Sequence, residues 1–187
     1  MRKWVSAVLI VVGTLCCVYA VYPILEVHQG INTALDKWED VKEDKIPEEE
    51  KDERADGIIG VLQLGDDEKK IPIHVGTGDK ELSQGIGLDE LTVLPGAIGN
   101  SVLYGHRENV LWELKDIEVG DLIKIQGVES TLVFEVKEIQ IVDPYDPYIY
   151  EKSQEPTITL VTCYPFIYMG PTPQRFLVRA QLKSIQN

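Results

Sequence analysis

Cysteine is scarce in this chain, and so is positive charge. The 187 residues include 3 cysteines and 3 histidines, and 18 basic residues stand against 31 acidic ones, which gives a formal net charge of −13. A protein that binds nucleic acid needs clustered Lys and Arg to displace counterions from the phosphates, so we expect no nucleic-acid partner. The length suits one compact domain with appendages, because cores of about 100–150 residues are the commonest.

Charged residues are also absent between Lys3 and Glu26. The 22 residues of 4–25 would extend about 33 Å as a helix, enough to cross a hydrocarbon core of ~30 Å. We predict a single transmembrane anchor there, with residues 1–3 inside and the rest of the chain outside the cell, because Lys and Arg favour the cytoplasmic side. The alternative is a signal peptide cleaved after residues 18–20, but the apolar run exceeds the ~7–15 residues of a usual signal core.

After the anchor, residues 26–56 show the features of a linker. Apolar residues recur there at three- and four-residue spacings, which predicts a short amphipathic helix that packs on the domain or lies at the membrane surface. These residues are Ile31, Ala34, Leu35, Trp38 and Val41. Acidic residues and lysines dominate from Glu39 to Asp56, so we predict an acidic extracellular spacer. Because no core signal precedes Gly57, the domain is expected to fold and remain soluble without residues 1–56.

From Gly57 to the end of the chain, short β-rich runs alternate with Gly, Pro, Asn and Asp. The predicted strands are 58–64, 71–75, 101–105, 121–126, 132–142, 157–162 and 176–182. Brief helical turns are expected at 80–84 and 108–114. Strands in this number, without regular helices between them, predict an all-β domain at 57–187, built as an antiparallel sandwich or barrel.

One cysteine stands out. Cys16 and Cys17 lie in the apolar run, so Cys163 is the only thiol in the part predicted to lie outside the cell, where thiols are normally paired or absent. It ends a β-rich run and is soon followed by Pro165, which cannot continue a strand ladder. A buried inert thiol or an intermolecular disulfide would explain Cys163, and so would a reactive nucleophile held at a strand end.

A nucleophilic cysteine needs a base nearby, because a thiol with a pKa of about 8.5 is mostly protonated at neutral pH. His106 is the best candidate, since a predicted strand runs into it beside Gly105; a hydrogen-bonded structural histidine is the alternative. His28 lies just past the anchor and is expected to be a solvated surface residue. His74 alternates with apolar residues within a predicted strand.

The oxyanion formed when a thiolate attacks an amide needs a fixed donor, and an arginine can supply it. Arg175 begins the last predicted strand, 12 residues after Cys163, and the loop between them can bring that strand back beside the cysteine. Arg179 has the same parity and is the second candidate, although its mid-strand position favours a structural charge. Arg107 should point away from the side that His106 faces.

These residues together resemble the sortases of Gram-positive bacteria. The family signature is Thr-Leu-x-Thr-Cys at the end of one strand, an Arg in the next strand and a His that ends an earlier one; here these are residues 159–163, Arg175 and His106. The stretch 163–176 is especially similar to class D sortases, and the stretch 94–107 matches the usual run into the family's histidine.

The resemblance covers about residues 57–182 and implies a closed eight-stranded β-barrel with cysteine transpeptidase activity. Cys163 would attack the Thr carbonyl of a Leu-Pro-x-Thr signal followed by Gly or Ala at the C-terminus of a secreted surface protein. His106 would act as acid and base, and Arg175 would stabilise the oxyanion. An amino group of a cell-wall peptidoglycan precursor would then resolve the thioester.

Three further residues are expected to bind substrate: Thr162, Leu160 and Tyr104. No metal or organic cofactor is expected, since thiol and imidazole perform the chemistry; calcium, which some sortases use, has no assigned ligands here.

Two other functions stay open. A pilin-polymerising sortase would link subunits through Lys side chains; such enzymes usually carry an Asp-Pro-aromatic lid before the barrel, whereas Asp143, Pro144 and Tyr145 follow a late strand. A non-catalytic, membrane-tethered binding module would bury Cys163.

Overall fold

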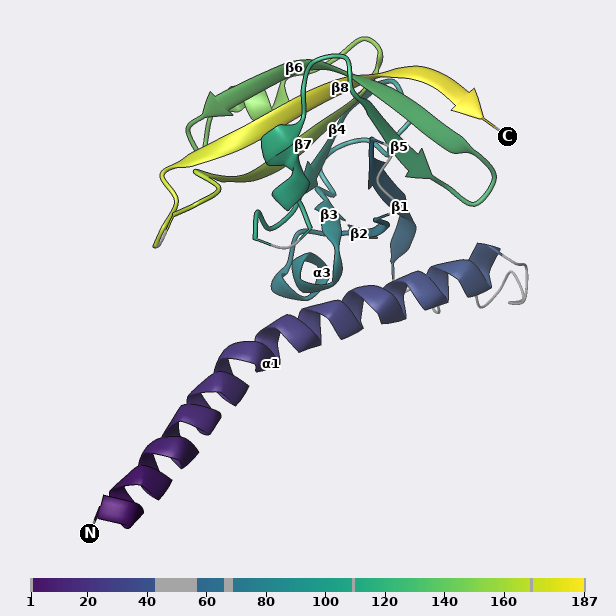
Figure 1. The fold of residues 1–187 in the computed structure, drawn as a ribbon. Coiled ribbons are helices and arrows are strands. Elements are labelled where there is room, and N and C mark those ends of the chain that lie inside the picture. Colours follow the sequence, from purple (N-terminus) through teal and green to yellow (C-terminus); the bar gives the residue numbers. More distant parts are fainter. Residues whose placement is uncertain (1, 43–56, 66–68, 109, 169, 187) are drawn as a thin grey trace.

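A long helix and a β-barrel make up the structure, a computed structural model that describes residues 2–42, 57–65, 69–108, 110–168 and 170–186 (Figure 1). The helices are α1 (Arg2–Lys42), α3 (Asp79–Gln84) and two 3₁₀ turns, η1 (Trp112–Asp116) and η2 (Pro147–Tyr150). The strands are β1 (Ile58–Leu64), β2 (Ile71–Val75), β3 (Ile86–Leu88), β4 (Gly99–Tyr104), β5 (Leu122–Gln126), β6 (Thr131–Val142), β7 (Pro156–Tyr164) and β8 (Gln174–Gln186).

The strands close into a barrel in the order β1-β2-β3-β4-β7-β8-β6-β5, which confirms the eight-stranded prediction. Pairing is antiparallel except between β2 and β3 and between β4 and β7. These two parallel pairs correct the expectation of a purely antiparallel sheet; each needs a crossover, supplied by α3 and by the segment that carries β5 and β6. β3 was not predicted, because three residues are too few to show alternation.

Side chains alternate between the two faces of each strand, and this decides what lines the outside of the barrel. On β7, Ile158 and Leu160 point into the main core, whereas Val161 points outward. An outer cluster covers β4, β7 and β8 beneath η2, and it consists of Val102, Val142, Ile149, Val161 and Leu177, with Tyr104 packed against it. The outer face of these three strands is therefore a second, smaller core with η2 as its cover.

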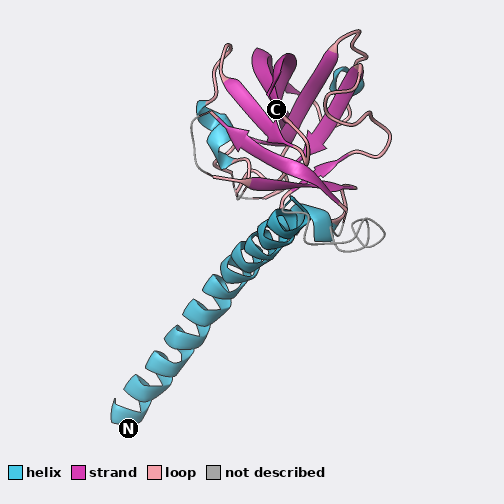
Figure 2. Cartoon of the chain, turned by 90° about the vertical axis from the view of Figure 1, so that its right-hand side faces the viewer, coloured by secondary structure: helices cyan, strands magenta, loops and turns pink. Residues whose placement is uncertain are grey.

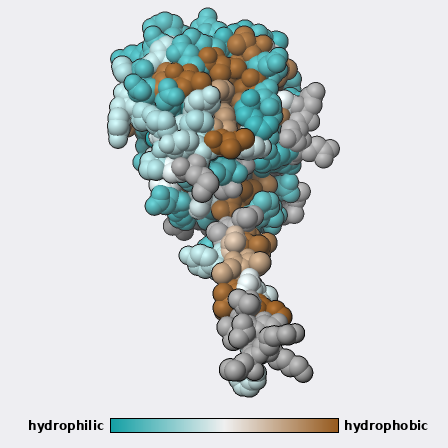
Figure 3. Space-filling view, turned by 60° about the vertical axis from the view of Figure 1, so that its left-hand side comes forward, coloured by the Kyte–Doolittle hydropathy of each residue, from teal (hydrophilic) through white to brown (hydrophobic). Residues whose placement is uncertain are grey.

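Helix α1 runs without a break through the predicted anchor and the predicted amphipathic segment. Within the described residues, its stretch Ile10–Asp40 is long and apolar enough to cross a membrane by length and composition. The half nearer the N-terminus stands clear of the mostly hydrophilic barrel domain and carries exposed apolar side chains (Figures 2 and 3).

The other half of α1 lies against the barrel near β1, β2 and α3 (Figure 1). Ala34 and Trp38 are only 4% and 3% exposed, and they pack with Ile58 and Val61 of β1. The amphipathic helix thus packs on the domain. The expectation that no core signal precedes Gly57 is wrong for Ala34 and Trp38, which belong to a core cluster with β1; folding of the domain without residues 1–56 stays a prediction.

Candidate active site

Cys163 and Arg175 lie directly opposite each other on neighbouring strands. β7 and β8 pair in a register that aligns Cys163 with Arg175 and Val161 with Leu177. Since Val161 and Leu177 face outward and side chains repeat every two residues, both candidates fall on the outer face of the barrel. The Cys163 thiol is partly exposed and not in a disulfide.

His106 follows β4, the strand that pairs with β7 on its other side. Tyr104, the last residue of β4, is in register with Val161, which lies two residues before Cys163 just as Tyr104 lies two residues before His106. The Gly105 N–H donates to the Val161 carbonyl at 3.1 Å, and the Thr162 hydroxyl donates to the Gly105 carbonyl at 2.7 Å. These two bonds fix the peptide before His106 to the strand that carries Cys163, so the fold brings all three candidate residues to the same region of the barrel surface.

The two arginines of β8 differ in their surroundings. The Arg179 guanidinium donates to Glu151 at 2.7 Å and to the Tyr148 carbonyl at 2.8 Å, and it lies 4.2 Å from the centre of the Tyr148 ring. It is thus engaged in fastening η2 to the barrel. Arg175 donates to the carbonyl of its neighbour Gln174 at 3.0 Å. Of the two arginines, it is the one paired with Cys163 across the strands.

Tyr104 belongs to a chain of hydrogen bonds beside these residues. Its hydroxyl lies 2.8 Å from that of Tyr150, whose hydroxyl donates to Asp89 at 2.7 Å. Burial is the main cause that raises the pKa of Tyr104, with a contribution from Asp89, whereas the bond with Tyr150 and the charge of Arg175 act to lower it. Tyr104 therefore lies within electrostatic reach of Arg175, and Tyr150, which the sequence did not single out, joins the same surface.

The structure places two of the expected substrate-binding residues elsewhere. Leu160 is fully buried in the main core, and Thr162 is 2% exposed with its hydroxyl bonded to Gly105. Both have the parity opposite to that of Cys163, so they point into the barrel and have almost no surface for a substrate.

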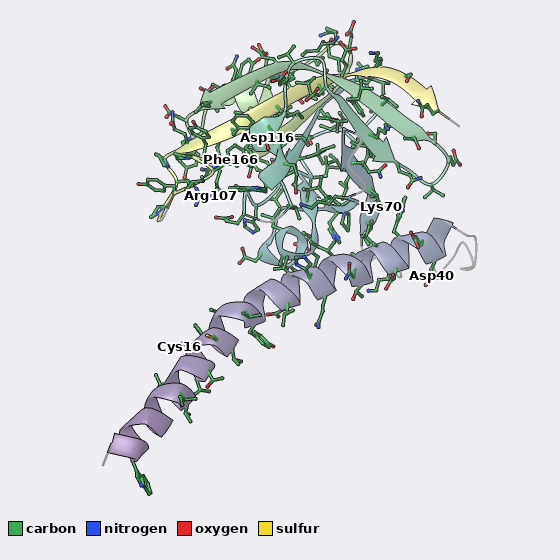
Figure 4. All side chains as sticks on the ribbon, in the orientation of Figure 1. Cys16, Asp40, Lys70, Arg107, Asp116 and Phe166 are labelled. Carbon is green, nitrogen blue, oxygen red and sulfur yellow. The ribbon has the colours of Figure 1, made fainter. Side chains whose placement is uncertain are left out.

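Arg107 had no predicted role beyond pointing away from His106. It is only 6% exposed, and its guanidinium donates to the carbonyls of Pro165 and Tyr168 in the segment that follows Cys163. Figure 4 shows Arg107 beside Phe166 at this end of the barrel. The arginine therefore joins the chain after His106 to the chain after Cys163.

A cluster of aromatic rings packs within and around the same segment. The Phe166 ring meets Phe176 edge-on at 5.2 Å between centroids and Trp112 at 6.2 Å, and Tyr164 stacks on Phe176 at 6.1 Å. Phe166 and Phe176 also pack against the main core. The rings therefore anchor the segment after Cys163 to the main core.

The other two histidines lie outside this region. His28 is exposed on α1, as expected, and His74 is 2% exposed on β2. In the part of the chain that the structure describes, no three His, Cys, Asp or Glu side chains gather closely enough to hold a metal ion.

Comparison with known proteins identifies the family. Residues 62–183 match the Sortase domain family, so the chain belongs to the sortase family. Class D sortases are among its relatives: Sortase D of Bacillus subtilis (strain 168) is 31% identical over 120 residues, which are 64% of this chain and 61% of that protein. The chain thus spans about three fifths of the length of this curated relative.

Solved structures of sortases are similar to this chain as well. A Sortase D5 transpeptidase of Clostridium perfringens superposes with a TM-score of 0.66 at 27% identity, over 82% of this chain and 97% of that one. The catalytic domain of SrtD from B. anthracis gives a TM-score of 0.58 at 31% identity, over 69% of this chain and 89% of that one.

Proposed function

We propose that this chain is a membrane-anchored, class D-like sortase, a cysteine transpeptidase that cleaves a Leu-Pro-x-Thr sorting signal before Gly or Ala and transfers the acyl group to an amine of a cell-wall precursor. The observation that carries the proposal is the register of three neighbouring strands. Cys163 on β7 is paired with Arg175 on β8, and β4, which ends two residues before His106, pairs with β7 on its other side.

The first half-reaction forms a thioester. His106 takes the proton of the Cys163 thiol, and the thiolate attacks the carbonyl carbon of the signal's Thr. The electron pair of the carbonyl moves to oxygen, where the Arg175 guanidinium stabilises the negative charge. When the C–N bond to Gly or Ala breaks, His106 gives its proton to the leaving amine.

In the second half-reaction, the amino group of a cell-wall precursor attacks the thioester carbonyl. His106 takes the proton of that amine, the new amide forms, and the Cys163 thiolate leaves. The net change is one amide exchanged for another, so no oxidant, reductant or metal is needed to balance the reaction.

The proposed reaction requires the barrel to lie outside the cell. We propose that the N-terminal half of α1 crosses the membrane once with residues 1–3 inside, so that the barrel meets secreted surface proteins and peptidoglycan precursors outside the cell. The exposed apolar side chains of that half support the membrane span, and the basic residues at its start support the orientation.

The test is a transfer assay with the full-length chain in detergent micelles. Peptides ending in Leu-Pro-x-Thr-Gly or Leu-Pro-x-Thr-Ala are offered with an amine acceptor, and mass spectrometry follows the thioester on Cys163 and the ligated product. Cys163→Ala should form neither. An adduct on a residue other than Cys163, or full transfer by Cys163→Ala, would refute the assignment.

The same assay separates the two arginines. Arg175→Ala should lower the rate of thioester formation by orders of magnitude, whereas Arg179→Ala should chiefly lower the melting temperature, because Arg179 holds η2 through Glu151 and Tyr148. Near-native turnover of Arg175→Ala would move the oxyanion role to another donor.

The non-catalytic alternative is tested by a methanethiosulfonate reagent, which should label the partly exposed Cys163 in the folded protein. Failure to label would show that the Cys163 thiol is not accessible, which would refute its role as the nucleophile. Ligation of the signal to a lysine of a pilin subunit, in preference to the precursor amine, would favour the pilin-polymerising alternative.

A further inference from the structure

We infer that Arg107 is a positioning residue that holds His106 at its working place beside Cys163, an inference that rests on the proposed function. Arg107 is the residue after His106, and its guanidinium reaches the segment that begins two residues after Cys163. It thus joins the loop that carries the proposed base to the loop that follows the strand of the proposed nucleophile.

The contacts of Arg107 are directional. Nη1 donates to the Pro165 carbonyl at 2.5 Å, Nη2 donates to the Tyr168 carbonyl at 2.8 Å, and Nε donates to Glu108 at 2.9 Å. A planar guanidinium offers donors in a fixed fork, so two carbonyls three residues apart define its orientation as well as its position.

Because the Arg107 guanidinium is buried, loss of these hydrogen bonds would not be compensated by water. The Arg107 side chain is 7% exposed, whereas the carboxylate of Glu108 that pairs with it is on a side chain 60% exposed. A buried guanidinium must satisfy its donors within the protein, and here two acceptors are backbone carbonyls of the loop that follows β7, the strand of Cys163. The loop cannot move away from β4 without leaving Arg107 or both carbonyls unbonded.

Packing around the neighbouring residue gives the bridge a rigid base. A Cβ built on Gly105 would lie 2.7 Å from Leu111 and 2.8 Å from Ile86, so the backbone before His106 is closely enclosed. Gly105 is also bonded to β7. The chain is therefore fixed on both sides of His106, by Gly105 before it and by Arg107 after it.

If Arg107 positions His106, its removal should displace the imidazole from the thiol while both reactive groups remain present. Displacement of a catalytic group by about 1 Å can lower a rate by ~100-fold. We expect Arg107→Ala to lower kcat for thioester formation by about 10–100-fold, with a smaller change in KM. Arg107→Lys keeps the charge without the fork and should fall between the parent and Arg107→Ala.

The decisive measurement is alkylation of Cys163 by iodoacetamide between pH 5 and 9, in the full-length protein with Cys16→Ala and Cys17→Ala so that one thiol remains. His106→Ala defines the profile of a cysteine without its partner. Arg107→Ala should adopt that profile although its imidazole is intact, which a purely structural role would not produce. Glu108→Gln is the matched control: it removes the exposed partner of Arg107, leaves both carbonyl bonds, and should stay within about twofold of the parent, as expected for an exposed ion pair.

Melting temperatures of all variants accompany these rates. The inference is overturned if folded Arg107→Ala keeps the parent's alkylation profile, whatever its kcat. If Arg107→Ala does not fold, Arg107→Lys decides by the same criterion. A parent profile that His106→Ala leaves unchanged would instead refute the Cys163–His106 pair of the proposed function. If no peptide is cleaved but His106→Ala does change the profile, the alkylation series still tests Arg107.

Discussion

Trp38→Ala should destabilise the barrel even though Trp38 belongs to the helix that leads to the predicted anchor. The indole is 3% exposed and packs with Ala34, Ile58 and Val61. Truncating a buried Trp to Ala costs about 3–5 kcal/mol, the sum of lost transfer free energy and the cavity that remains.

The magnitude should fall at the lower end of that range. Among the described residues, the buried Nε1 of Trp38 has no hydrogen-bond partner, and an unsatisfied buried donor costs about 1–3 kcal/mol. The native side chain therefore already carries a penalty that alanine removes. We expect a net loss of about 3 kcal/mol for Trp38→Ala, and a change under about 1 kcal/mol for Trp38→Phe, which keeps an aromatic ring without the donor.

Urea unfolding of a chain comprising residues 26–187 measures this directly. That chain omits the predicted anchor and keeps the half of α1 that packs on β1. With a slope of about 2 kcal/mol per M, a loss of 3 kcal/mol lowers the midpoint by about 1.5 M. The control is Tyr145→Ala, because Tyr145 is 96% exposed and its removal should not shift the midpoint.

A shorter chain, residues 57–187, extends the argument. It uncovers Ile58 and Val61, so it should unfold at a lower urea concentration than the chain of residues 26–187. If Trp38→Ala leaves the midpoint unchanged and the two chains are equally stable, the contact between α1 and β1 contributes nothing and the reasoning fails.

Three further outcomes are expected. Cys163→Ala should abolish peptide cleavage and transfer, and His106→Ala and Arg175→Ala should each lower kcat/KM by orders of magnitude because the three groups act as a unit; a steady-state peptide assay checks this. Gly105→Ala should destabilise the protein by about 1–3 kcal/mol through overpacking and also lower kcat, as thermal melting and the same assay would show; native values for both would contradict the close packing. Burial and the bond to Glu138 raise the pKa of Tyr148 to about 12. The contribution of this group to stability is therefore complete below its unfolded pKa of about 10, and it is lost as the pH rises toward 12. Urea midpoints measured at pH 8, 10 and 11 should decline less steeply with pH in Tyr148→Phe than in the parent.

Local signals in the sequence were sufficient for most of the fold. The predicted strands 58–64 and 71–75 match β1 and β2 to the residue, since β-branched residues bounded by turn formers specify a strand locally. β3 was missed because the extended form of Ile86–Leu88 comes from pairing with β2 and β4, and its three residues show no local alternation.

For the candidate site, the sequence by itself determined the residue types. A single thiol outside the apolar run, a histidine and an arginine at predicted strand ends, and the Thr-Leu-Val-Thr-Cys motif were sufficient to suggest the family. Their proximity was not, because Cys163 and Arg175 meet only through the β7–β8 register and His106 reaches them only through the parallel pairing of β4 with β7.

Only the tertiary structure decided which side chains face the site. Strand parity buries Leu160 and Thr162 and leaves Cys163 outside, and the parallel pairing of β4 with β7 brings Arg107 to the carbonyls of Pro165 and Tyr168. It also made Trp38 part of the core. The physical reason is the same in each case: composition and periodicity describe neighbours along the chain, whereas burial and hydrogen-bond partners depend on residues brought together from far apart in the sequence.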